Sequence, residues 1–336
     1  MSEQKRILSG MRATGPRLHL GNYEGALRRW VELQDEGHKV FSFVADWHVL
    51  TTKADKPEQI AYNAREVAKD FIAAGLDPAR TTIFIQSQVK EHAELTLLFG
   101  MVVGVGKLER NPTYKDMIQD IGSEGFISFG LLGYPVLQAA DIFLYKPYGV
   151  PVGKDQVPHL EVGNDIIRAF NSRFGEVFQE IVPLVPQDET RAKLPGLDAD
   201  DNGNLRKMSK SYDNCIYLNE SEDETAERVK RAFTTPTKLR KTDPGVPEGC
   251  AVCQYLKLYS SNWRQQWDED IAGERGCMQS KKELTECLNE FLRPMRERRA
   301  QLDDATVEDI LKKGAEEARE VAAATMDEVR RAMRLS

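Results

Sequence analysis

Long hydrophobic runs are missing from this 336-residue sequence. A helix needs roughly 18 or more consecutive apolar residues to cross a bilayer, and no such stretch occurs. The first residues, MSEQKRILSG, also lack the apolar core of a secretory signal. We therefore expect a cytoplasmic protein without membrane association.

Cysteine and histidine are scarce, with five residues of each. An odd number of cysteines in a long chain without an export signal argues against a disulfide framework. The histidines other than His19 show no spacing typical of metal ligands, so we interpret them as surface or core polar groups, with His48 and His159 near the predicted cleft: His38, His48, His92 and His159. The cysteines are Cys215, Cys250, Cys253, Cys277 and Cys287.

Positive charge is in the minority, since 46 Lys and Arg face 53 Asp and Glu and the net charge is -7. This balance argues against avid non-specific binding to nucleic acid, so any such surface has to be local. Basic clusters occur at residues 228–233, 238–241 and 293–299. Each alone is typical of a solvated helix face, but together they offer a local surface for RNA.

What the first 190 residues do contain is an alternation of short apolar runs and amphipathic stretches. Strands are predicted for RILSG (6–10), KVFSFVADW (39–47), TTIFIQS (81–87) and GVPVG (149–153). Helices are predicted from Tyr23, from Pro57, across 92–104, over 127–146 and through 159–170. This order favours the α/β class, a Rossmann-like, doubly wound parallel sheet that binds ligands where its strand order reverses.

The amino-acid composition changes after Gly196. The stretch GLDADDNGNLRKMSKSYDN is polar and rich in Gly, Asp and Asn, which predicts a mobile loop. From Glu222 the sequence is mostly helical, and its last helix is predicted to begin at a capping box, Thr306-x-x-Asp309. We expect a catalytic domain over 1–195, a mobile loop and linker over 196–220, and an all-helical domain over 221–336 whose last helix packs back on the catalytic domain.

The stretch LHLGNYEG (18–25) is a candidate phosphate site. Gly21 allows close backbone approach at the mouth of the following helix, where free amides and the helix dipole favour an anion. His19 and Asn22 add side-chain donors for charge that develops on a phosphoryl group. Taken alone, H-x-G-N is more typical of a tight turn with a surface histidine.

A second motif, KMSKS (207–211), favours the phosphate site over the simple turn. Lys207 and Lys210 are movable point charges suited to phosphates, and they lie on a Gly/Asp-rich segment. The motif follows the first by about 190 residues, where a doubly wound domain would end. The coincidence of both motifs favours a nucleotide site.

The HxGN and KMSKS pair resembles the signature motifs of the class I aminoacyl-tRNA synthetases. Over nearly the whole chain the sequence resembles the bacterial tryptophanyl-tRNA synthetase family, through GNYEGALRRWVELQ, FVADWHVLTT, GYPVLQAADIFLY and VPVGKDQVPHLE in that order. The resemblance implies ligation of L-tryptophan to its tRNA with ATP, through a tryptophanyl-adenylate. It also implies a homodimer and a helical domain that contacts the anticodon.

Carried over residue by residue, the resemblance implies three groups of site residues. The catalytic residues would be His19, Asn22, Lys207 and Lys210. ATP would be bound by Arg12, Ala13, Thr14, Gly21, Asn22, Gly153, Lys154, Asp155, Leu194, Lys207, Met208, Ser209, Lys210 and Ser211. Tryptophan would be bound by Tyr134, Gln138, Asp141 and Gln156, with Asp141 accepting the indole N–H.

Elementary chemistry supports these roles. Indole has one donor and no acceptor, so a selective pocket needs a fixed acceptor at the end of an apolar slot. Tyr134, Gln138 and Asp141 are spaced to share one helix face, although an ordinary helix carboxylate is the alternative for Asp141. The amino acid's carboxylate is itself the nucleophile, so we expect no general base, and Mg²⁺ with the lysines neutralises the leaving pyrophosphate.

Several positions depart from the commonest family pattern. The turn MRATGPRLHLGN has one residue more between its glycines than many relatives. Gln138 stands where many bacterial members have methionine, and tyrosine-specific relatives carry a glutamine nearby, so a tyrosine-specific enzyme remains an alternative. The VGKDQVPHLE string and the lack of an extra C-terminal RNA-binding module favour tryptophan.

The cysteines suggest a metal only in part. Cys250-x-x-Cys253 is a typical start of a zinc site, and some family members hold an iron–sulfur cluster near Cys250 and Cys277. Ser280 occupies one of the remaining cluster positions, and no cysteine lies between 254 and 276. We therefore expect no tightly bound metal or cluster.

Two further alternatives belong to other classes. A nucleotidylyltransferase of the same superfamily shares the H-x-G-x turn, but such chains are usually shorter and lack KMSKS and a large helical appendix. A non-catalytic paralogue would bind RNA or another protein. The presence of His19, Asn22, Lys207, Lys210 and Asp141 counts against that alternative.

Overall fold

A five-stranded parallel sheet forms the centre of the N-terminal part of this computed structural model, which describes residues 4–53, 57–121, 126–153, 157–185, 191 and 194–335. The strands are β1 (Arg6–Met11), β2 (Lys39–Val44), β3 (Thr82–Ile85), β4 (Gly149–Pro151) and β5 (Val182–Leu184). Their order is β3-β2-β1-β4-β5, so it reverses between β1 and β4. The predicted doubly wound α/β class is confirmed.

Helices cover both faces of this sheet, because successive side chains of each strand point to opposite sides. Ile7, Val40 and Ile83 pack against one set of helices, and Leu8 and Phe41 pack against the other. The helices of this part are α1 (Leu20–Asn22), α2 (Arg28–Asp35), α3 (Asp46–Lys53), α4 (Glu58–Ala73), α5 (Glu91–Gly100), α6 (Val105–Glu109), α7 (Pro112–Ile121), α8 (Phe129–Phe143) and α9 (Val157–Phe174).

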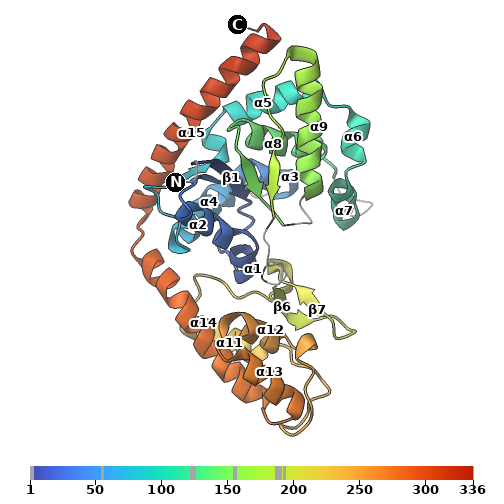
Figure 1. Ribbon diagram of the computed structural model, residues 1–336, viewed down its shortest axis with the longest axis vertical. Coiled ribbons are helices and arrows are strands. Elements are labelled where there is room, and N and C mark those ends of the chain that lie inside the picture. The colour runs from blue at the N-terminus through green and yellow to red at the C-terminus, as the bar shows by residue number, and fades with distance from the viewer. Residues whose placement is uncertain are drawn as a thin grey trace.

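The C-terminal part is helical and is built from α11 (Glu222–Arg231), α12 (Ala251–Tyr259), α13 (Trp263–Ala272), α14 (Cys277–Ala300) and α15 (Asp304–Met333). Figure 1 shows α14 leading from this part up to the sheet and α15 continuing along the edge of the sheet domain. Helix α15 packs on β3, and a Cβ on Gly314 would collide with the Ile83 backbone. Glycine there permits the close approach.

The segment predicted as an open loop, 196–220, contains regular structure. Strands β6 (Pro195–Ala199) and β7 (Leu205–Lys207) form an antiparallel hairpin, and a 3-10 turn, η4 (Lys210–Tyr212), follows. Leu197 and Met208 are buried, and the Asn214 side chain donates to Asp198 and to the Lys207 carbonyl. The polar composition concealed the two apolar anchors that fix this hairpin.

Two predicted strands were too long at their carboxyl ends. The strand predicted over 39–47 ends at Val44, because the Asp46 carboxylate accepts from the Trp47 and Ser87 amides and starts α3. The strand predicted over 81–87 ends at Ile85, and a 3-10 turn, η2 (Gln86–Gln88), follows. Both chain reversals bring polar side chains to the same edge of the sheet.

Some helix boundaries also differ from the prediction. The helix predicted from Tyr23 begins at Leu20, and its stretch Tyr23–Leu27 is a π-helix, η1. The helix predicted over 92–104 ends at Gly100. The last helix is capped by Asp303, whose side chain accepts from the Thr306 amide, so the predicted capping box at Thr306 is wrong. The remaining turn is η5 (Pro247–Gly249).

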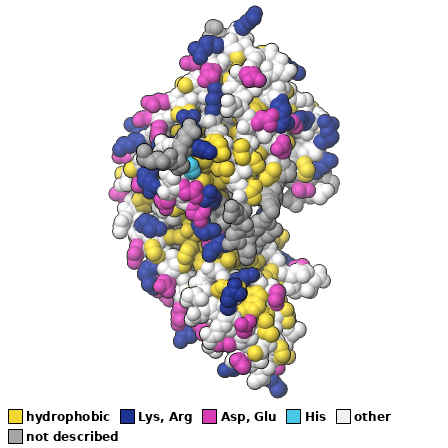
Figure 2. All heavy atoms as spheres, in the orientation of Figure 1, with side chains coloured by type: hydrophobic (Ala, Val, Ile, Leu, Met, Phe, Trp, Pro, Cys, Tyr) yellow, Lys and Arg dark blue, Asp and Glu magenta, His cyan; other side chains and the backbone are white. Residues whose placement is uncertain are grey.

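Charges of both signs alternate on the edge formed by α14 and α15 (Figure 2). Several of them pair across elements, as in Arg299 with Asp70 and Arg330 with Glu94. Within the described ranges, no helix is long and apolar enough to span a membrane.

Candidate active site

A cavity of about 390 Å³ opens where the strand order reverses, at the carboxyl ends of β1 and β4. Ligands bind at this position in doubly wound folds. The lining combines backbone of β1 and β4 with side chains of α3, α7 and α8, and it includes Arg12, Tyr134, Gln138, Asp141 and Gly153. Five of the residues predicted to bind substrate therefore share one cavity.

Asp141 is the most strongly hydrogen-bonded group of this cavity and is 1% exposed. Its Oδ2 lies 2.8 Å from Nε2 of His48, and its Oδ1 lies 2.7 Å from Nδ1 of His92. The Gln86 amide reaches both oxygens, at 2.7 and 2.8 Å. Burial raises the pKa of Asp141, but the hydrogen bonds from His48 and His92 outweigh it and hold this pKa below its ordinary value.

Arg12 and Tyr134 line the same cavity beside this carboxylate. Burial lowers the pKa of Arg12, which remains a cation, and burial raises the pKa of Tyr134, which keeps its phenolic proton. An apolar wall faces them, with Phe43, Ile142 and Val150. The cavity thus offers an apolar slot with a fixed negative acceptor at one place and a cation at another.

The HxGN turn is an N-terminal helix cap. The Asn22 amide donates to Nδ1 of His19, and Oδ1 of Asn22 accepts from the His19 amide. Burial, with Lys210 and Lys207 nearby, lowers the pKa of His19 to about 4. The ring is therefore neutral at pH 7, and because Nδ1 is an acceptor, Nε2 carries the proton and is the donor.

The two motifs meet in this structure. The Gly21 amide lies 3.2 Å from Sδ of Met208. A Cβ on Gly21 would lie 3.1 Å from the His19 ring, which explains the glycine. On the other side of the turn, a Cβ on Gly15 would lie 3.5 Å from Nζ of Lys210. The HxGN turn and the KMSKS segment are therefore in direct contact.

Main-chain pairing holds the motifs together. The Leu20 amide donates to the Ile216 carbonyl, and the Leu218 amide donates to the Leu18 carbonyl, each at 2.9 Å. Within KMSKS, Ser209 caps the turn that contains Lys210, and its own amide donates to Oδ1 of Asn214. Lys207 is exposed and Lys210 is half-buried, so both ammonium groups lie near solvent.

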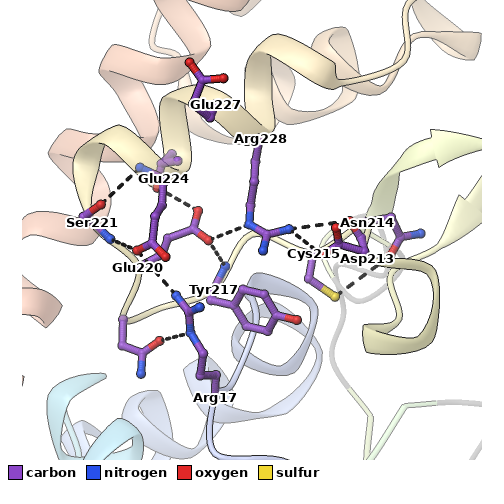
Figure 3. A network of polar contacts seen from close by, with 12 residues as sticks. Arg17, Asp213, Asn214, Cys215, Tyr217, Glu220, Ser221, Glu224, Glu227 and Arg228 are labelled. Atoms are coloured by element: carbon purple, nitrogen blue, oxygen red, sulfur yellow. Dashed lines mark hydrogen bonds and ion pairs between the residues drawn. The ribbon is translucent and has the colours of Figure 1, made fainter.

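A polar network joins this segment to the helical part (Figure 3). Arg228 of α11 contacts Glu220 at 3.1 Å and Asp213 at 3.0 Å. Asp213 directly follows the KMSKS turn in the left-handed region, with φ 49°. Glu220 is fully buried, and Tyr217 donates its amide to it. Arg228 therefore links α11 to the end of KMSKS.

The turn with the additional residue belongs to the same network. Figure 3 shows the Tyr217 ring between Arg17 and Arg228, whose guanidinium carbons lie 4.4 and 5.0 Å from the ring centroid. Nε of Arg17 donates to Asn219 at 2.7 Å. The arginine of TGPRL thus faces the linker after KMSKS and connects the two motifs.

The remaining predicted site residues divide into three groups. Ala13 and Leu194 are buried in the core beneath the site, while Thr14 and Ser211 are closer to the surface. Lys154, Asp155 and Gln156 lie outside the described residues.

Sequence reasoning missed the partners of Asp141, which are His48, Gln86 and His92. It interpreted both histidines as ordinary polar groups and placed Gln86 inside a strand. The available signal was position, because Gln86 and His48 follow buried strands that end at the edge where the ligand binds.

No group of three or more His, Cys, Asp or Glu side chains could hold a metal ion in the described part of the chain. Cys250 and Cys253 are buried, Cys277 and Cys287 are half-buried, and all five cysteines are free thiols.

Comparison with known proteins gives one family. The profile of the tRNA synthetases class I (W and Y) matches residues 1–293. A tryptophan–tRNA ligase of Thermotoga maritima is 46% identical over 98% of this chain and 99% of its own, and one of Streptococcus pneumoniae is 41% identical over 98% and 97%. A Campylobacter jejuni tryptophanyl-tRNA synthetase structure, complexed with ADP and tryptophan, has a TM-score of 0.85 and 32% identity over 98% of this chain and 99% of that one.

Proposed function

The chain belongs to the class I tRNA synthetases of the tryptophan and tyrosine type, and we propose that it ligates L-tryptophan to its tRNA with ATP, through a tryptophanyl-adenylate. One observation carries this proposal. Asp141 is a buried, ionised acceptor at the end of an apolar slot, and it shares this cavity with Arg12. Arg12 precedes the HxGN turn by only a few residues. An indole and a phosphate chain would lie end to end in such a site.

The tryptophan end would select its substrate before any chemistry. Asp141 accepts the indole N–H while Phe43, Ile142 and Val150 cover the ring. A phenol is a shorter donor that would not fill the slot, and a side chain without a donor would leave Asp141 underbonded. Tyr134 and Gln138, on the same helix face, line the slot beside it.

The phosphate end would act by charge. The substrate carboxylate attacks the α-phosphate, the bond to the β-phosphate breaks, and pyrophosphate leaves with the bonding electrons. Nε2–H of His19 and the Lys207 and Lys210 ammonium groups neutralise that leaving group. Mg²⁺ enters with ATP as part of the substrate, held mainly by phosphate oxygens and water, because the described groups here are donors and cations.

The partners follow from this activity. The tRNA would contact the helical part, which we assign to residues 221–336, with the catalytic domain over 1–195 and the segment 196–220 closing between them. A homodimer is supported by large exposed apolar side chains at or beside α8 and the two helices that pack on it, α5 and α6: Leu97, Met101, Val105, Phe126 and Phe129. Such exposure is typical of a covered interface. We place the protein in the cytoplasm, without a resident metal.

The deciding experiment is ATP–pyrophosphate exchange with each of the twenty amino acids. We expect exchange with tryptophan. Exchange with tyrosine instead would show that tyrosine is the substrate. No exchange with any of the twenty amino acids would contradict the enzyme assignment. Sedimentation of the purified chain checks the dimer.

A further inference from the structure

A buried relay lies next to the carboxylate of Asp141. Nδ1 of His92 is 2.7 Å from Asp141, and Nε2 of the same ring is 2.8 Å from the Tyr145 hydroxyl. His92 and Tyr145 are both 0% exposed, and neither is among the residues that line the cavity. Their side chains act on a ligand only through Asp141.

The protonation states of this relay follow from its members. Asp141 is ionised and only accepts, so Nδ1 of His92 carries a proton and donates to it. Burial raises the pKa of Tyr145 well above its ordinary value, so the phenol keeps its proton. In a neutral ring, Nε2 is then the acceptor of the Tyr145 O–H. The chain of donation runs from Tyr145 to His92 to Asp141.

The surroundings make this order rigid. Phe84 lies against both rings, because its ring centroid is 6.3 Å from that of His92 and 5.5 Å from that of Tyr145. The Phe43 ring centroid is 6.0 Å from that of His92. Hydrogen bonds in such an apolar setting are strong, and a missing partner there is costly. His92 is on α5 and Tyr145 lies just after α8, so the relay also joins the cavity-lining helix α8 to the helix that packs against it.

The carboxylate has about four acceptor positions. Among the described residues three donors use them, namely His48, His92 and the Gln86 amide that spans both oxygens. A substrate N–H can therefore donate to Asp141 once the Gln86 amide contacts one carboxylate oxygen instead of two. His92 and Gln86 are both fully buried, but the Gln86 amide has to release one oxygen, whereas the His92 ring keeps its contacts with Asp141 and with Tyr145. The orientation of that acceptor therefore depends on His92.

We propose that His92, fixed by Tyr145, is a specificity-determining positioning residue: it orients ionised Asp141 so that the carboxylate recognises the indole N–H. The inference rests on the proposed tryptophan activation. It adds that recognition of this N–H depends on two side chains that never touch the substrate.

The test compares L-tryptophan with β-(benzothiophen-3-yl)-alanine, in which sulfur replaces the indole N–H. The readout is kcat/KM in ATP–pyrophosphate exchange. We expect the wild type to prefer tryptophan by about 10- to 100-fold, the value of one hydrogen bond to a charged acceptor. His92→Leu is expected to reduce that preference to about 2- to 5-fold, with KM for ATP unchanged.

Two further variants separate positioning from packing. His92→Asn retains an N–H near the place of Nδ1 and is expected to keep most of the preference. Tyr145→Phe removes only the hydroxyl and is expected to reduce the preference for tryptophan to an intermediate value. If His92→Leu does not fold, this variant tests the positioning role instead. ¹⁵N NMR of labelled histidine is expected to give the Nδ1–H pattern for His92.

The outcomes are distinct. If His92→Leu and Tyr145→Phe lower exchange with both amino acids equally, the pair only supports the fold and the inference is wrong. An Nε2–H pattern for His92, or an Asn variant that behaves like Leu, also overturns it. If the wild type does not activate tryptophan at all, the proposed function fails instead.

Discussion

The Asp141 cavity and the KMSKS segment, which we propose as the tryptophan end and the phosphate end of the site, are built in opposite ways. At the tryptophan end, Asp141 is buried and is fixed by donors from α3, η2 and α5. At the phosphate end, Lys207 is exposed and Lys210 is half-buried on a short turn, which Asn214 and Arg228 hold at its base. One end is set before substrate arrives, and the other leaves its charged groups movable.

The difference matches what each end has to do. Selection of a side chain requires an acceptor whose position is already fixed, because a loose acceptor would adapt to a wrong ligand. Charge on the leaving pyrophosphate develops during the reaction, so the cations that meet it have to follow it, and a segment that closes can do this.

Asp141→Ala should have the largest effect. It removes the acceptor and leaves His48, His92 and Gln86 with unmet donors, so we expect kcat/KM for tryptophan to fall about 100- to 1,000-fold in ATP–pyrophosphate exchange. KM for ATP should change little. Asp309→Ala, an exposed position on α15, is the control and should behave as wild type. Equal losses for tryptophan and ATP would contradict a role in indole recognition.

Lys210→Ala should act on the phosphate end and should change kcat more than KM. Loss of a cation that meets the leaving group is expected to lower kcat for adenylate formation by about 100-fold, with a small change in KM for tryptophan. Lys207→Ala should act in the same direction, while Lys313→Ala on the exposed face of α15 serves as the control. A change in KM alone would mean that these lysines only dock substrate.

Arg228→Ala tests whether the base of the turn matters. Asp213 loses its partner, so Lys210 should be positioned less often, and we expect kcat to fall about 3- to 10-fold. Arg228→Lys should recover part of this. Because buried Glu220 also loses a partner, urea unfolding should show a loss of about 1–3 kcal/mol. Arg231→Ala, on the same helix, should change neither quantity.

The smallest effect concerns the pKa of His19. Its folded value is about 4 and its ordinary value is 6.5, so the unfolded chain binds more protons between these pH values. The contribution of the neutral ring to stability is therefore complete above pH 6.5 and is lost as the pH falls from 6.5 toward 4. Between pH 7 and about pH 5.5, wild type should lose about 1 kcal/mol more than His19→Asn in urea unfolding. Parallel losses would contradict the depressed pKa.

Local patterns in the sequence led to much of the site but not to its supports. The HxGN and KMSKS motifs marked His19, Asn22, Lys207 and Lys210, and the family resemblance marked Asp141, whose helical spacing agrees with the proposed role. The donors around Asp141 are 49, 55 and 93 residues away from it in the chain, and no local pattern marks such distances. The same holds for Arg17 and Arg228, whose stacking on Tyr217 appears only when three segments fold together.

Local sequence was enough to predict the alternation of strands and helices, the parallel doubly wound sheet and the positions of the HxGN and KMSKS motifs, because periodicity and turn chemistry act over a few residues. Three features follow from the folded chain instead: the polar stretch before KMSKS is a hairpin, Gly21 meets Met208, and Asp141 is held by His92, which in turn contacts Tyr145. Burial is the physical reason. A polar side chain removed from water has to find its partner wherever the fold has placed one, and that place is a property of the whole chain.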